Sequence, residues 1–63
     1  MKFSYDNNVD SLYIQFQKDD VIESEELMPG VVLNIDRDGN VVGIEISDAS
    51  AKLGCKPDSV VEL

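Results

Sequence analysis

Two alternating apolar runs on either side of an Asp-Gly pair constrain this chain more than any other feature. The runs are Val31–Ile35 and Val42–Ile46, and Asp38-Gly39 lies between them. Asp-Gly favours a two-residue hairpin loop, because both central residues of that loop need positive φ. We therefore predict a β-hairpin with three apolar pairs on one face: Ile35 with Val42, Leu33 with Ile44, and Val31 with Ile46.

A second register uses a three-residue loop with Gly39 at a bulge. It would pair Ile35 with Val41 and Leu33 with Gly43, so the two apolar stripes would fall out of phase. The two-residue loop is therefore preferred. It leaves the remaining side chains on the opposite face: Val32, Asn34, Asp36, Val41, Gly43, Glu45 and Ser47.

The N-terminal segment has the same alternation and predicts a second hairpin. Its four-residue loop is 7–10, and its apolar pairs are Tyr5 with Leu12, Phe3 with Ile14, and Met1 with Phe16. Asp6 and Asp10 flank this turn. We interpret them as turn residues whose side chains accept nearby backbone N–H groups, rather than as a catalytic carboxylate pair.

The middle of the chain predicts an exposed edge strand over Val21–Glu25. Clustered glutamates discourage another strand from pairing there, and this segment carries Glu23, Glu25 and Glu26. Leu27 and Met28 are expected to fold back onto the core before the Pro29-Gly30 turn.

The alternation of apolar and polar residues ends after Ser47. Ser47 or Asp48 can cap a short helix over Ala49–Leu53, Gly54 suits its C-terminus, and Leu53 is expected to dock on the sheet. The tail 54–63 stays unassigned, with three alternatives for Val60 and Val61: a short strand, packing on the helix, or fraying.

A chain of 63 residues is expected to form a single domain, 1–63, with a thin core, because only about 60% of the unfolded surface is buried at this size. One cysteine, Cys55, and no histidine leave no disulfide or zinc site to compensate. A dimer, or a partner covering an open sheet face, would supply the missing burial.

The net charge of −8 disfavours nucleic acid and anionic membranes as partners. It suits a basic protein partner or a cation, although excess carboxylate also keeps a small protein in solution. The N-terminus has no apolar leader, and no run approaches the roughly 18 residues of a membrane span. We expect a cytoplasmic protein.

One pattern suggests a metal. Asn34, Asp36 and Asp38, followed by Gly39 and later Glu45, have the spacing of an EF-hand calcium loop. That loop needs helices on both sides, whereas the flanks here alternate with the period of strands. A weak cation site on the hairpin is therefore the alternative hypothesis, with these metal ligands: Asn34, Asp36, Asp38 and Glu45.

Enzymatic chemistry has little support. The chain has no histidine base, nucleophile elbow or glycine-rich phosphate loop, and Cys55 has no candidate activating base. Exposed Tyr13 is a contact candidate. We predict no catalytic residues, no cofactor and no enzymatic activity.

Several short motifs in order resemble the domain of unknown function 2283 family, a group of short uncharacterised prokaryotic proteins. The likeness covers residues 1–53, and residues 54–63 extend beyond it. It implies a compact, mostly β domain and transfers no catalytic residues. The motifs are Tyr5-Asp6, Asp10 with Leu12-Tyr13-Ile14, Pro29-Gly30-Val31, Asp36 through Gly39, Val42 through Ile46, and Asp48-Ala49-Ser50.

Together these features predict an α+β fold: a small antiparallel β-meander of four to five strands with a short C-terminal helix. The functional hypothesis is a non-enzymatic protein-interaction module. It would form a homo-oligomer or bind a basic protein, for example as an antitoxin-like partner. Weak calcium binding at the Asn34 to Glu45 hairpin is the alternative.

Overall fold

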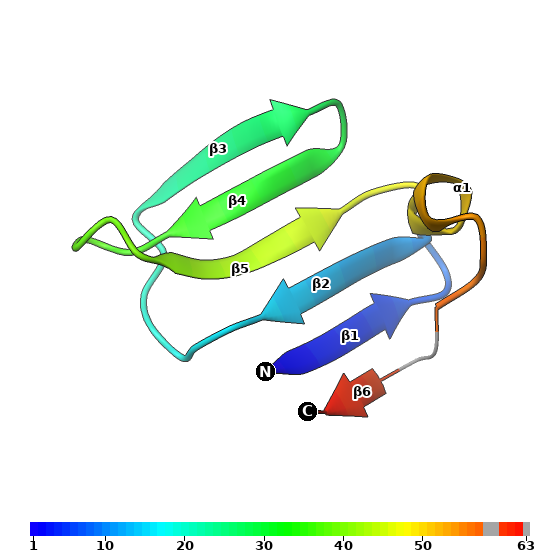
Figure 1. The fold of residues 1–63 in the computed structure, drawn as a ribbon, viewed down its shortest axis with the longest axis horizontal. Helices are drawn as coiled ribbons and strands as arrows, with labels where there is room; N and C mark the ends of the chain where they lie inside the picture. The colour runs from blue at the N-terminus through cyan, green and yellow to red at the C-terminus, as the bar shows by residue number, and fades with distance from the viewer. Residues whose placement is uncertain (58–59, 63) are drawn as a thin grey trace.

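A computed structural model describes residues 1–57 with their side chains and the backbone of 60–62. It confirms the predicted fold class: one antiparallel sheet and one short helix (Figure 1). The sheet order is β3-β4-β5-β2-β1-β6, and the link 16–22 passes the ends of β5 and β4 to reach β3. The elements are β1 Lys2–Asp6, β2 Ser11–Gln15, β3 Glu23–Met28, β4 Val31–Ile35, β5 Val41–Ile46, α1 Ala49–Leu53 and β6 Val60–Glu62.

The central hairpin between β4 and β5 forms, but its loop differs from the prediction. Asp36 N donates to Asn40 O at 3.0 Å, and Gly39 N donates to Asp36 O at 3.1 Å. Gly39 has φ +83°, whereas Asp38 is not among the residues with positive φ. The two-residue Asp38-Gly39 loop is therefore wrong: three residues, 37–39, form a turn that places only the glycine in the left-handed region.

A bulge then restores the apolar register. Ile35 pairs with Val41, while the next residue back along β4, Asn34, pairs with Gly43. Val42 is the extra residue, and its carbonyl accepts from Phe16 N at 2.8 Å. Two of the predicted pairs are thereby confirmed, Leu33 with Ile44 and Val31 with Ile46, while Ile35 with Val42 is wrong.

Tyr13 lies across Gly43 where β2 meets β5. A Cβ added at Gly43 would meet the Tyr13 ring and would lie 2.7 Å from the Ile14 carbonyl oxygen. Gln15 pairs with Gly43, and Tyr13 with Glu45. The glycine thus lets two backbones and an aromatic ring approach closely in the middle of the sheet.

The N-terminal hairpin has the predicted register, with Phe3 opposite Ile14 and Tyr5 opposite Leu12. The ladder ends where Lys2 pairs with Gln15, so the expected Met1–Phe16 pair is not part of it. As predicted, Asp6 acts as a turn residue: its carboxylate accepts from Asn8 N at 2.9 Å.

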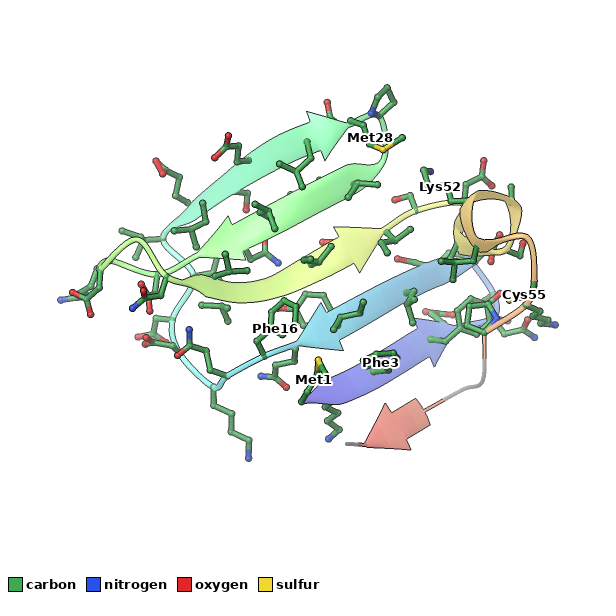
Figure 2. The ribbon with its side chains drawn as sticks, viewed as in Figure 1. Met1, Phe3, Phe16, Met28, Lys52 and Cys55 are labelled. Atoms are coloured by element: carbon green, nitrogen blue, oxygen red, sulfur yellow. The ribbon has the colours of Figure 1, made fainter. Side chains whose placement is uncertain are left out.

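β3 is an edge strand, as the glutamates predicted, but it runs from Glu23 rather than Val21 and continues to Met28. All six of its residues are exposed. The expectation that Leu27 and Met28 fold back onto the core is wrong, because β3 extends through both and leaves them 56% and 54% exposed. Figure 2 shows Met28 at the β3–β4 turn.

The main buried cluster lies at one end of the sheet, beside α1, and Val42, which is 2% exposed, is buried separately near the start of β5. Tyr5, Leu12 and Ala49 form a buried cluster, with Ala49 fully inaccessible, and Phe3, Ile14 and Ile46 pack against it. The predicted helix bounds are confirmed, and Gly54 ends the helix with φ +75°. The predicted docking of Leu53 is wrong: Leu53 is 47% exposed, and small Ala49 makes the contact instead.

Part of the unassigned tail adds a strand. β6 pairs antiparallel with β1, with Phe3 opposite Val61. Of the three alternatives for Val60 and Val61, the short strand is the one observed. Residues 58, 59 and 63 of that tail lie outside the described residues.

We expect Gly43→Ala to lower the free energy of unfolding by about 2 kcal/mol, because its Cβ cannot fit beside the Ile14 carbonyl without moving a strand. Urea unfolding followed by circular dichroism measures this loss. Gly39→Asn is the matched control, because asparagine tolerates positive φ and nothing lies within 4 Å of a Cβ there. Equal stability of wild type and Gly43→Ala would contradict the close approach.

Candidate interaction face

The strand register separates the sheet into two chemically different faces. Residues directly opposite each other in an antiparallel pair point to the same side. Two rows therefore run across β1, β2, β5 and β4 on one side, and we call their eight side chains the apolar face. The first row is Phe3, Ile14, Ile44 and Leu33, and the second is Tyr5, Leu12, Ile46 and Val31.

The opposite, polar face carries the hydrophilic partners of the same strands. It also has two rows. One is Ser4, Tyr13, Glu45 and Val32, and the other is Lys2, Gln15, Gly43 and Asn34. Tyr13, predicted as a contact candidate, is half-buried here because its ring covers Gly43. Sheets of this kind usually pack their apolar face on a core and leave the polar face in water.

Most of the apolar face lacks such a core. Its only buried members are Tyr5 and Leu12, which lie beside α1, and the other six are half-buried. Figure 1, viewed down the shortest axis, shows α1 at the end of the sheet and no described element over its strands. In Figure 2, Phe3 lies on β1, and Phe16, which is 44% exposed, lies near the tip of β2.

The overall dimensions agree with a single layer. The principal extents are 34 × 26 × 17 Å, and the radius of gyration is 11.7 Å. A compact chain of 63 residues has a radius of gyration of about 10.6 Å. The flat shape therefore keeps both sheet faces near the surface.

Asp10 joins the N-terminal hairpin to the helix. Its carboxylate accepts from the Tyr5 hydroxyl at 2.6 Å and the Ser50 hydroxyl at 2.7 Å, and also from Ser50 N at 3.1 Å. Its backbone carbonyl accepts from Ala49 N at 3.0 Å. Asp10 thereby satisfies the first amides of α1, the role that a capping side chain usually has.

The predicted side-chain cap from Ser47 or Asp48 is wrong. Asp48 occupies the capping position with φ 55° and makes no side-chain capping hydrogen bond. The expectation for Asp10 also needs correction: its side chain accepts from the backbone amide of Ser50, 40 residues away, rather than from an amide in its own turn. Periodicity carried no signal for this contact, because it depends on how the chain returns to its start.

Asp36 organises the central turn in a similar way. It is 3% exposed, and one carboxylate oxygen accepts from both Asp38 N and Asn40 N, each at 2.9 Å. These amide donors, Asn40 first, lower the pKa of Asp36. Its carboxylate is therefore committed to the turn backbone.

The four predicted metal ligands lie in different surroundings and do not share one site. Asn34 accepts from the Ser24 hydroxyl at 2.9 Å, Asp36 is bonded to turn amides, Asp38 is exposed in the loop, and Glu45 is exposed on the polar face. Within residues 1–57, no three acidic, cysteine or histidine side chains form a cluster able to hold a metal ion. The EF-hand spacing arises here from a turn and two strands, and calcium binding stays a prediction.

The remaining candidates have simple surroundings. Cys55 is exposed beyond α1 (Figure 2), and Glu23, Glu25 and Glu26 are exposed along β3. On the apolar-face side, Glu25 lies opposite Leu33, so an acidic edge borders the apolar rows. In the part of the chain that the structure describes, no helix is long and apolar enough to cross a membrane.

These features define a small α+β domain with one open apolar sheet face. A model of the family described as Protein of unknown function (DUF2283) matches residues 2–50, and the chain belongs to that family. The resemblance inferred from its motifs is thereby confirmed. No curated protein and no solved structure matches the chain.

The Tyr5–Asp10 contact predicts a change in tyrosine ionisation. The hydrogen bond to Asp10, together with burial, raises the pKa of Tyr5 from 10.0 to about 12. In Asp10→Asn we expect this pKa to fall towards 10, because the neutral amide no longer opposes a phenolate. Ultraviolet pH titration measures the change, with Tyr5→Phe identifying which transition belongs to Tyr5. A pKa that stays near 12 in Asp10→Asn would contradict this origin.

The two committed carboxylates predict an acid-sensitive stability. The Tyr5 and Ser50 hydroxyls lower the pKa of Asp10, and turn amides lower that of Asp36, below the usual 3.8. Their contribution is complete above that value and is lost as pH falls through the lower folded pKa values. Urea midpoints measured below about pH 4 should therefore fall less steeply in Asp36→Asn than in wild type. An unchanged slope would contradict the assignment to Asp36.

Proposed function

We propose that this chain is a non-enzymatic protein-interaction module that uses its apolar face to contact another protein. The observation that carries the proposal is the uncovered part of that face. Six of its eight side chains are only half-buried, and its two buried members, Tyr5 and Leu12, belong to the cluster at the α1 end. Contiguous apolar surface of this kind usually marks a site of protein or membrane contact.

The distribution of charge favours a protein over the other classes. The net charge of −8 opposes anionic lipid and nucleic acid. Across β1, β2, β5 and β4, the two described rows of the apolar face contain no charged residue, while Glu25 and Glu23 border them on β3. An apolar centre with a polar rim is the usual composition of a protein interface.

Two kinds of partner fit this surface. A second copy would present the same apolar rows, and a basic protein would complement the acidic border, as an antitoxin-like pair does. The proposal includes a cytoplasmic location in a prokaryotic cell, where either partner would be available.

Leu33→Lys is expected to weaken this contact at least tenfold, because it places a charge within the apolar face. Val32→Lys is the matched control: it is the adjacent, half-buried residue of β4, on the polar face. Both lysines would lie opposite a glutamate of β3, Glu25 or Glu26, so both variants should retain the fold. Light scattering after size-exclusion chromatography, and binding to candidate basic partners, would be compared for wild type and both variants.

Circular dichroism confirms that each variant is folded before binding is compared. Loss of association in Leu33→Lys but not in Val32→Lys supports the proposal. A folded wild type that stays monomeric and binds no candidate partner, or equal association in both variants, contradicts it.

A further inference from the structure

We infer that a second copy of this chain covers the apolar face, so that two sheets pack face to face as a β-sandwich. This inference rests on the proposed function and names its partner. It is carried by three observations: the single-layer thickness of the molecule, the lack of charge in the rows of the apolar face, and the position of the carboxylates.

The sheet is one layer thick. The two long extents of the whole molecule are 34 and 26 Å, and the apolar rows cross four neighbouring strands, about 4.8 Å apart, inside that outline. The thin third dimension, 17 Å, means that a second sheet about 10 Å away would turn a single layer into an ordinary two-layer domain.

The chemistry of the face is complementary to itself. The rows from Phe3 to Leu33 and from Tyr5 to Val31 are apolar throughout, so stacking two copies buries no charge from these strands. A two-fold contact requires this kind of self-complementary surface. A basic partner would find opposite charges only at the acidic border, Glu23 and Glu25, and none over the rows themselves.

The carboxylates lie outside the apolar rows. Glu45 is exposed on the polar face and Asp38 lies in a loop, whereas Glu23 and Glu25 are on the apolar-face side, opposite Ile35 and Leu33, but on the edge strand β3. Stacking the apolar faces points the polar faces away from each other, so the repulsion between groups such as Glu45 acts across both sheets, while Glu23 and Glu25 lie at the border of the contact. At physiological ionic strength the Debye length is about 8 Å, which screens charges at that separation.

This placement gives the dimer a characteristic salt dependence. Two chains of charge −8 repel at low ionic strength, so added salt should tighten self-association. Between about 0.01 M and 1 M salt the Debye length falls from about 30 Å to 3 Å, and we expect the dimer Kd to fall by about tenfold. A complex with a basic partner would weaken over the same range.

Symmetry indicates which residue to replace with cysteine for cross-linking. Ile14 and Ile44 pair between the two middle strands, β2 and β5, and lie in the row beyond the one beside α1. A two-fold axis lying in the plane of the face passes near its centre, so Ile44 of each copy would approach the other.

The experiment uses the full chain with Cys55→Ser, because Cys55 is an exposed thiol. Ile44→Cys and Glu45→Cys are compared under mild oxidation, together with sedimentation equilibrium of the wild type across the salt range. We expect a disulfide-linked dimer from Ile44→Cys and little from Glu45→Cys. Random collisions would give the opposite order, because Glu45 is the more exposed of the two.

The outcomes separate the inference from the proposed function. A dimer that tightens with salt and cross-links at Ile44→Cys supports both. A dimer that cross-links only at Glu45→Cys, or one unaffected by Leu33→Lys, overturns the face-to-face arrangement. A monomer that binds a basic protein, with that binding abolished by Leu33→Lys, overturns the second copy but retains the interaction module. A folded monomer whose binding never depends on Leu33 overturns both.

Discussion

Two quantities govern this structure: the area of its apolar sheet face and the length of chain that covers that face. Within the described residues, six strands form one sheet, and only the five-residue helix α1 packs beside it. The cluster of buried apolar residues lies where Ala49 meets Tyr5 and Leu12, while towards the other end of the strands Val42 and Asp36 are the buried side chains. The flat shape and the proposed interaction follow because the described residues place one short helix at the end of the sheet and no element over it.

The central hairpin has to meet two requirements: the local chemistry of its turn, and the pairing of apolar residues on one face of the sheet. The bulge at Val42 satisfies both. The turn at Asp36 to Asn40 uses three loop residues, with Gly39 in the left-handed region and the Asp36 carboxylate bonded to two amides. Continued without interruption, this register would place Leu33 opposite Gly43. One extra residue in β5 returns Leu33 to Ile44, at the cost of one irregular step in the ladder.

Asp10 shows how a short chain connects its parts with few residues. It holds Tyr5 of the same hairpin and the first turn of α1, which is distant in sequence. A five-residue helix is too short to be stable alone in water, so it depends on tertiary contacts. Asp10 and the burial of Ala49 supply them, and both place α1 at the end of the sheet rather than across it.

The sequence alone determined the positions of β1, β2, β4 and β5, the pairing of Phe3 with Ile14 and of Tyr5 with Leu12, the edge position of β3 and the bounds of α1. Alternation and turn residues suffice for these because they act over a few neighbouring positions. It did not determine the central loop, the cap of α1 or the exposure of Leu27, Met28 and Leu53. Tertiary structure decided these, since each depends on which strand pairs with which and on where the helix meets the sheet. For the same reason the EF-hand spacing was visible in the sequence, while the separate surroundings of Asn34, Asp36 and Glu45 became apparent only from the sheet.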